Sequence, residues 1–139
     1  MRPSDFTLLF MNGEAKMMTF CGLFLEREGF KVISTDNALD VAEKLSERKV
    51  DLLVFDLQAK GENTFELFMR LIEEHPGLPI IVLSDRYRDT VEDLISRGYP
   101  ITGLVDESVA LSDLNEKILE VLNIKREVHL RKLQKAWAV

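Results

Sequence analysis

Acidic and hydroxyl side chains follow the apolar segments of this sequence at the points where those segments end. The stretch KVDLLVFDL, residues 49–57, runs four apolar residues into Asp56, and the stretch PIIVL is followed by Ser84. Glu14 and Asp106 stand close behind two further apolar stretches. A carboxylate in such a position can bind a metal cation or act as a nucleophile, and a hydroxyl can hydrogen-bond to an anionic group. These side chains can act together only if the fold brings their segments to one place.

The apolar segments alternate with segments of helical spacing. Strand-like runs occur at Phe6–Met11, Phe30–Ser34, Asp51–Phe55, Pro79–Leu83 and Ile101–Val105. Helical spacing occurs in Glu14–Glu28, Ala38–Arg48, Asn63–Glu74, Tyr87–Arg97 and a fifth segment that starts near Leu111. This alternation predicts an α/β fold with a parallel sheet covered by helices on both faces. Such sheets bind ligands beyond the carboxyl ends of their strands, where Asp56 and Ser84 are expected.

The charge of the chain is divided unevenly. The 139 residues carry a net charge of −6, from 18 Lys and Arg and 24 Asp and Glu. Five of the basic residues and one acidic residue lie in residues 125–139, so this segment carries +4 and residues 1–124 carry −10. An acidic body disfavours direct binding to nucleic acid.

The length of the chain suits one domain, which we expect over residues 1–124. Leu111 to Val139 contains no proline or glycine, and its apolar positions continue beyond the length of one helix in such a domain. We interpret residues 125–139 as an extension of the last helix. This extension would be a tail, a dimer contact or a linker to an output module.

No feature of a secreted or membrane protein stands out in the sequence. The uncharged run Met17–Leu25 is too short to span a bilayer, and no signal peptide precedes it. The single cysteine, Cys21, cannot form an internal disulfide and lies in an apolar helical stretch, so we assign it to core packing. We therefore expect a cytoplasmic protein with no membrane partner.

Motifs for nucleotide binding and nucleophilic catalysis are missing. The loop after the first strand contains neither GxGxxG nor GxxxxGK[ST], and no GxSxG turn occurs. Neither His75 nor His129 follows a strand, so histidine supplies no base for a nucleophile. We expect no enzymatic activity. A flavodoxin-like module that binds a small ligand remains an open, weaker alternative.

The order of the groups at the strand ends, the DLLVFDL strand and the PIIVLS strand together resemble the receiver domain of two-component response regulators. The resemblance covers about residues 5–123. It implies a doubly wound, flavodoxin-like (βα)5 fold with a five-stranded parallel sheet in the order 2-1-3-4-5. It also implies that Asp56 accepts a phosphoryl group from a histidine kinase in the presence of Mg²⁺, and that Ser84 is the switch hydroxyl that bonds this group.

Other positions depart from the family pattern. Where the family has two acidic residues after the first strand, this chain has Asn12 and Gly13, followed by Glu14. Asp56, Glu14 and Asn12 could form only a weak magnesium site, so we expect no required cofactor. The lysine of the family aligns with Asp106, or with Val105 if the register shifts by one residue, and no lysine lies between Lys60 and Lys117.

These losses predict an atypical receiver with a degenerate phosphorylation site. A like charge about 6 Å from a phosphoryl group costs on the order of 3 kcal/mol at an effective dielectric of about 20. Asp56 could instead cap backbone amides of the following loop, and Ser84 could cap the next helix. We therefore predict a protein-interaction switch with impaired or absent phosphorylation; the alternative is a working acceptor phosphorylated at Asp56.

The expected partner is a signalling protein, either a histidine kinase or an output partner, and a homodimer is also possible on this interpretation. The usual contact surface of the family is formed by the fourth helix, the fifth strand and the fifth helix. Val91, Leu94 and Leu104 lie on or near this face in the sequence pattern. We expect substitutions there to weaken self-association or partner binding.

Overall fold

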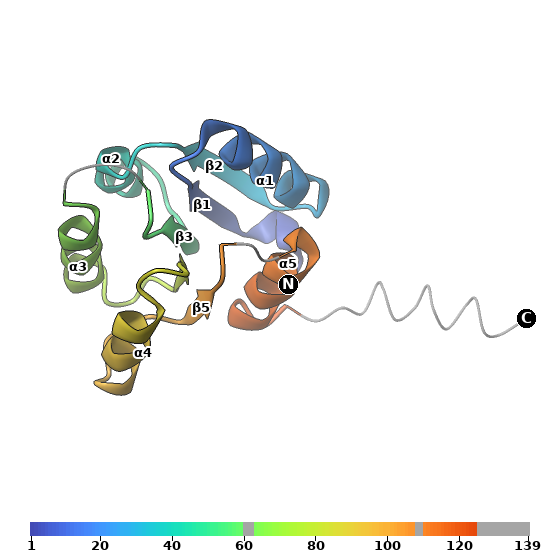
Figure 1. Cartoon of the computed structure of the whole chain (residues 1–139). Coiled ribbons are helices and arrows are strands. Elements are labelled where there is room, and N and C mark those ends of the chain that lie inside the picture. Colours follow the sequence, from blue (N-terminus) through green and yellow to red (C-terminus); the bar gives the residue numbers. More distant parts are fainter. Residues whose placement is uncertain (60–62, 108–109, 125–139) are drawn as a thin grey trace, which may run out of the picture.

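The computed structural model describes residues 1–59, 63–107 and 110–124 of the chain. Its strands form one parallel sheet in the order β2-β1-β3-β4-β5, the order that the resemblance implies (Figure 1). The strands are β1 (Thr7–Met11), β2 (Lys31–Thr35), β3 (Leu52–Asp56), β4 (Ile80–Leu83) and β5 (Gly103–Val105). The flavodoxin-like fold class is therefore confirmed.

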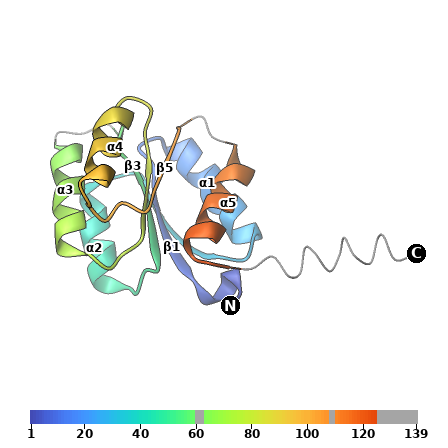
Figure 2. The same cartoon turned by 90° about the horizontal axis from the view of Figure 1, so that it is seen from below.

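Helices cover both faces of the sheet (Figure 2). One face carries α1 (Ala15–Arg27) and α5 (Leu111–Val121), and the other carries α2 (Leu39–Glu47), α3 (Thr64–Glu74) and α4 (Arg88–Ser96). A short 3₁₀ turn, Pro3–Asp5, precedes β1. Within the described residues, no helix has the length and apolar character needed to cross a membrane.

Strand β3 lies at the centre of the sheet and is buried along its whole length. Successive side chains of a strand point to opposite faces, so β3 contributes to two core layers. Leu53 and Phe55 pack with the layer under α2, α3 and α4, where Phe68 contacts Phe55 with ring centroids 5.5 Å apart. Leu52 and Val54 pack with the layer under α1 and α5. This two-sided packing explains the continuous apolar run in the sequence.

The predicted elements agree closely with the observed ones in residues 1–121. Gly29 and Gly98 follow α1 and α4 with positive φ angles of 106° and 91°, as expected of helix ends. Cys21 is 4% exposed, which confirms its place in the core, and burial raises the pKa of its thiol to about 11. The thiol is therefore protonated at neutral pH.

The sequence predicts that the last helix continues beyond Val121. This prediction is wrong for residues 122–124, because α5 ends at Val121. Asn123 adopts a left-handed conformation with a φ of 55°. Its N–H donates to the carbonyl of Glu120 at 3.1 Å, and the N–H of Ile124 donates to the carbonyl of Leu119 at 2.9 Å. This bonding pattern ends a helix and turns the chain. The expected extension, residues 125–139, lies outside the described residues.

A substitution at Gly29 tests whether the turn from α1 into β2 requires glycine. A Cβ atom at this φ of 106° would lie 3.3 Å from Cβ of Pro3, so we expect Gly29→Ala to lower the free energy of unfolding by about 1 to 2 kcal/mol. Gly77→Ala is the matched control, because no atom lies within 4 Å of its Cβ position. Urea unfolding of both variants measures the difference, and equal stabilities would contradict this role.

Candidate functional site

Asp56 is the last residue of β3 and lies 4% exposed at the carboxyl edge of the sheet. Its Oδ1 accepts a hydrogen bond from the N–H of Gln58 at 3.0 Å, in the loop that follows β3. Its Oδ2 accepts a hydrogen bond from the N–H of Gly13 at 2.9 Å, in the loop that follows β1. The carboxylate thus caps backbone amides, as the sequence suggested, and it connects two loops.

Ser84 directly follows β4, which lies next to β3 in the sheet. The residue is completely buried, and its N–H donates to the carbonyl of Val105 at 3.0 Å. Its Oγ accepts a hydrogen bond from the N–H of Tyr87 at 3.0 Å. The hydroxyl therefore stabilises the turn that leads into α4, just before the helix begins at Arg88.

Gln58 is a site residue that the sequence interpretation did not single out. Its side-chain oxygen accepts hydrogen bonds from the backbone N–H groups of Asp85 and Arg86, the second at 2.7 Å. The hydroxyl of Ser84 lies 3.5 Å from the same oxygen. Gln58 thereby joins the loop after β3 to the loop after β4. No sequence motif marks this role, because it depends on the approach of two loops.

The two acidic residues after β5 point in different directions. Asp106 is exposed and pairs with the guanidinium of Arg88, which also lies 3.2 Å from the carboxylate of Glu92. Exposed pairs of this kind contribute at most about 1 kcal/mol to stability. Glu107 instead hydrogen-bonds to Asp56 through its side chain. Thus Glu107, not the aligned Asp106, meets Asp56 at the end of β5.

The surroundings of Glu107 favour its protonated form. Burial is the largest cause, followed by the hydrogen bond to Asp56 and the negative charges of Asp56 and Asp85, and together they raise the pKa of Glu107 from 4.5 to about 8. Its Oε1 is buried and accepts no hydrogen bond from the described part of the chain. Its backbone N–H donates to Asp85 Oδ1 at 3.1 Å, which holds the residue in place. With a proton on Glu107, the two neighbouring carboxyl groups carry one negative charge instead of two.

The candidate magnesium ligands do not form a site that fits the ion. Asn12 is 5% exposed, and its side-chain oxygen accepts a hydrogen bond from the N–H of Glu14 at 2.9 Å. Glu14 itself is exposed, while both oxygens of Asp56 accept backbone hydrogen bonds. In residues 1–59, 63–107 and 110–124, no three His, Cys, Asp or Glu side chains are placed to hold a metal ion. Magnesium usually takes one or two protein carboxylates in octahedral geometry.

The predicted interaction residues are largely internal. Val91 has no exposed surface and Leu94 is 9% exposed, because this side of α4 faces the sheet. Leu104 packs against the same core layer, whereas Ile95 on α4 is 38% exposed. Substituting Val91 or Leu94 would therefore disturb the fold. Whether this face of the domain binds a partner stays a prediction.

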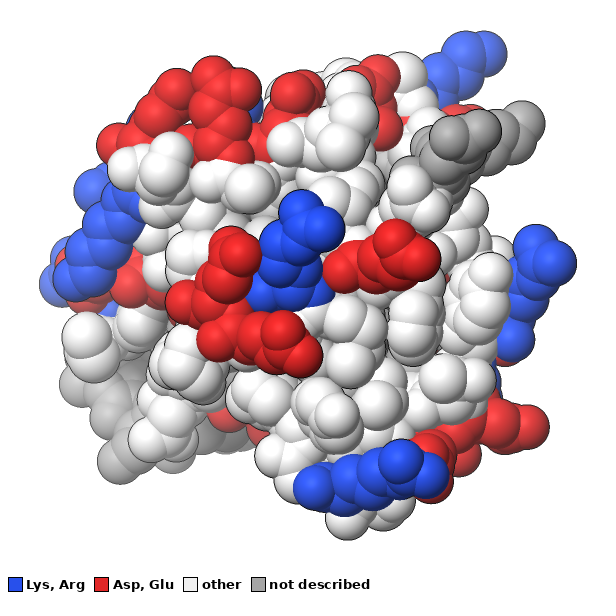
Figure 3. Space-filling view, turned by 90° about the vertical axis from the view of Figure 1, so that its left-hand side faces the viewer, with Lys and Arg blue, Asp and Glu red and all other residues white. Residues whose placement is uncertain are grey.

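The side of the molecule that carries α3 shows mixed charges (Figure 3). Lys and Arg side chains lie there beside Asp and Glu side chains, among large uncharged areas. The described residues on this side form no continuous basic area of the kind that binds the phosphates of nucleic acid.

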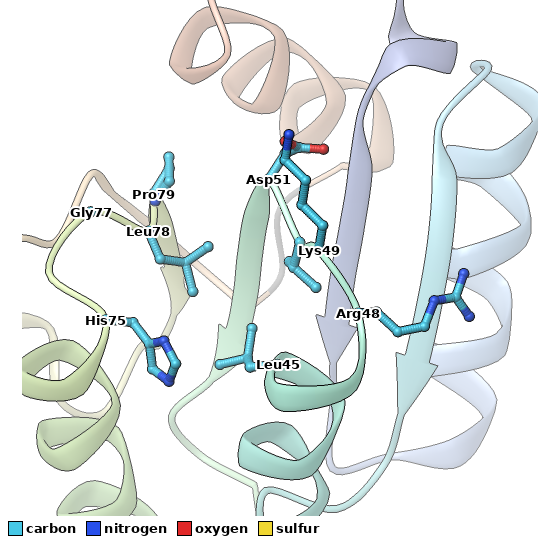
Figure 4. Close-up of a pocket in the computed structure, with 9 residues that line it drawn as sticks. Leu45, Arg48, Lys49, Asp51, His75, Gly77, Leu78 and Pro79 are labelled. Carbon is cyan, nitrogen blue, oxygen red and sulfur yellow. The ribbon is translucent and has the colours of Figure 1, made fainter.

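A pocket of about 540 Å³ lies at the opposite edge of the sheet, at the amino ends of β3 and β4 (Figure 4). Leu45, His75 and Leu78 line it, whereas the side chain of Arg48 points away from them. The cationic groups near this pocket therefore do not converge on one point, and the pocket lacks the features of an anion site.

Comparison with known proteins identifies the family. Residues 8–119 match the family described as "Response regulator receiver domain". The match covers most of the chain, so this chain belongs to the response regulator receiver domain family.

Curated relatives are longer than this chain. The response regulator GtcR of Aneurinibacillus migulanus is 31% identical over 84 residues, which are 60% of this chain and 34% of GtcR. The transcriptional regulatory protein GlrR of Escherichia coli is 29% identical over 77 residues, which are 55% of this chain and 17% of GlrR. The chain therefore spans about a third of one relative and less than a fifth of the other.

Solved structures share the fold at low sequence identity. A CheY-like receiver domain protein from Methanospirillum hungatei has a TM-score of 0.73 at 22% identity, covering 84% of this chain and 93% of its own. TrrA of Thermotoga maritima, solved in complex with Mg²⁺ and BeF, has a TM-score of 0.71 at 19% identity, covering 87% and 99%.

Replacement of Glu107 by glutamine tests the protonated pair. The folded chain keeps the Glu107 proton up to about pH 8, whereas the unfolded chain releases it near 4.5. The stability that this group contributes is therefore complete below pH 4.5 and is lost as the pH rises through 8. Glutamine stays neutral, so Glu107→Gln should raise the free energy of unfolding at high pH by about 1 to 2 kcal/mol, allowing for partial exposure.

Urea unfolding of the native chain and Glu107→Gln at a series of pH values measures this effect. Asp106→Asn is the matched control, because its side chain is exposed and pairs with Arg88. The stabilities of native chain and Glu107→Gln should converge at acidic pH. A constant difference at all pH values would contradict the shared proton.

Proposed function

We propose that this receiver domain acts as a protein-interaction module in which phosphorylation of Asp56 is impaired or absent. The observation that carries the proposal is the side chain of Glu107, which hydrogen-bonds to Asp56 one residue after Asp106, the position that the family resemblance aligns with its lysine. Asp56 is then held as a structural carboxylate by Gly13, Gln58 and Glu107.

The charges around Asp56 support this proposal. Phosphorylation would replace the single negative charge of Asp56 by about two, close to the charged Asp85 and to the protonated Glu107. Each like charge at about 6 Å costs on the order of 3 kcal/mol at an effective dielectric of about 20, which exceeds one typical hydrogen bond. Arg88 is the candidate cation on α4, but it pairs with Asp106 and Glu92.

The proposed partner is a signalling protein. Receiver domains interact with histidine kinases and with output domains. The relative GlrR is a transcriptional regulatory protein, and the part of it that matches this chain is 17% of its length. We propose that this domain contacts a kinase, an output partner or a second copy in the cytoplasm, without enzymatic activity of its own and without a required cofactor.

A working phosphoacceptor is the second candidate function. It is favoured by the placement of Asp56 and Ser84 at the ends of the adjacent strands β3 and β4, the arrangement that the family resemblance requires. On this function, a histidine kinase would transfer its phosphoryl group to Asp56.

Intact mass of the chain after incubation with acetyl phosphate and Mg²⁺ separates the two functions. We expect no phosphoryl adduct on the native chain, and Asp56→Asn gives the background. A receiver domain that is labelled under the same conditions is the positive control. An adduct on the native chain that is missing from Asp56→Asn would make Asp56 a working acceptor and refute the proposal.

A second set of variants tests the proposed cause of the impaired phosphorylation of Asp56. Asn12→Asp, Gly13→Asp and Glu107→Lys together would supply two acidic residues after β1 and a cation beside Asp56. We expect this triple variant to form the adduct. The matched variant with Asp106→Lys in place of Glu107→Lys should not form it, because the side chain of Asp106 points toward Arg88. Equal labelling of both variants would contradict the assigned role of Glu107.

A further inference from the structure

The outer side of α1 carries large apolar side chains without a covering element among the described residues. Phe20 is 70% exposed, Leu23 is 58% exposed and Met17 is 42% exposed. These residues lie three positions apart, so they form one apolar strip along the helix. Exposed apolar residues that lie together, unlike single ones, mark contact surfaces.

The apolar strip continues toward α5. A pocket of about 500 Å³ lies between the amino-terminal parts of the two helices, which run side by side on one face of the sheet (Figure 2). Met17 and Phe20 line this pocket on α1, and Leu111 and Leu114 line it on α5. Glu107 also lines it, so the pocket borders the acidic site.

The chain leaves the described domain at the amino edge of the sheet, near the last turn of α1 and the Leu23 end of the apolar strip. The turn at Asn123 ends α5, and Ile124 is 8% exposed in the core layer that also contains Phe6 and Phe30. Those two phenylalanines directly precede β1 and β2. Ile124 therefore lies at the amino edge of the sheet, near the end of α1, and residues 125–139 start from there.

Length and charge suit residues 125–139 as the occupant of this surface. A helix rises about 1.5 Å per residue, so the 13 residues of α1 extend over about 20 Å, which a segment of 15 residues can follow in helical form. Residues 14–28 and 107–124, which hold the two helices, contain seven acidic and three basic residues, and their net charge is −3 while Glu107 is protonated. Residues 125–139 carry +4, from five basic residues and one acidic residue. Opposite charges favour their association.

The apolar residues of residues 125–139 also suit contact with the apolar strip on α1. Leu130, Leu133 and Trp137 are spaced by three and four residues, so they would share one face of a helix. We propose that residues 125–139 fold back within the same molecule and dock on α1 and α5, with these apolar residues against Met17, Phe20 and Leu23. This inference goes beyond the proposed function and does not depend on it.

Fluorescence of Trp137, the single tryptophan of the chain, tests the proposal in the 139-residue chain. We expect acrylamide to quench Trp137 weakly in the native chain and about twofold more strongly in Phe20→Glu, because a buried charge in the contact shifts the segment to the undocked state. Leu133→Asp should have the same effect without changing the folded body. Leu39→Glu is the matched control, because Leu39 is 68% exposed on α2, on the other face of the sheet.

Two results would overturn the proposal. Equal quenching of Trp137 in the native chain, Phe20→Glu and Leu133→Asp would show that the segment does not dock. Protection of Trp137 that disappears on dilution would show that a second copy, rather than the same molecule, supplies the segment. Thermal unfolding by circular dichroism checks that Phe20→Glu retains the fold.

Discussion

The carboxylate of Asp56 is buried, and the arrangement of the loops at the carboxyl edge of the sheet depends on the groups that stabilise its charge. Asp56 ends a strand that is buried on both faces, so its charge cannot be left without partners. Two backbone N–H groups and the carboxyl group of Glu107 supply them. A proton on Glu107 takes the place of a cation. The charge of Asp85, which also acts on this pair, opposes any further negative charge at this position.

The fold creates this arrangement through the parallel sheet. The loops after β1, β3, β4 and β5 meet at one edge because their strands run in the same direction. Asp56 connects the loops after β1 and β3, and Gln58 connects the loops after β3 and β4. Asp85, after β4, accepts a hydrogen bond from the backbone N–H of Glu107, after β5. The site is therefore a network of loop-to-loop hydrogen bonds around acidic side chains.

The fold could be predicted from the sequence because hydrophobic periodicity and glycines at helix ends are local signals. Asp56 and Ser84 could be predicted as site residues because they stand at the ends of strands. Sequence reasoning could not find Gln58 or separate Asp106 from Glu107. Their roles depend on which way a side chain turns after β5, and a shift of one residue reverses this direction. The end of α5 was missed for a related reason, since an asparagine, Asn123, takes the left-handed position that glycine usually marks.

The most direct test of the shared proton is a titration of the Glu107 side-chain carboxyl by carbon-13 NMR, with the signal assigned by its loss in Glu107→Gln. The account predicts a pKa of about 8 for this group, well above its ordinary value of 4.5. A titration near 4.5 would mean that Glu107 is ionised at neutral pH. The carboxyl pair would then not hold a proton, and the central claim would be wrong.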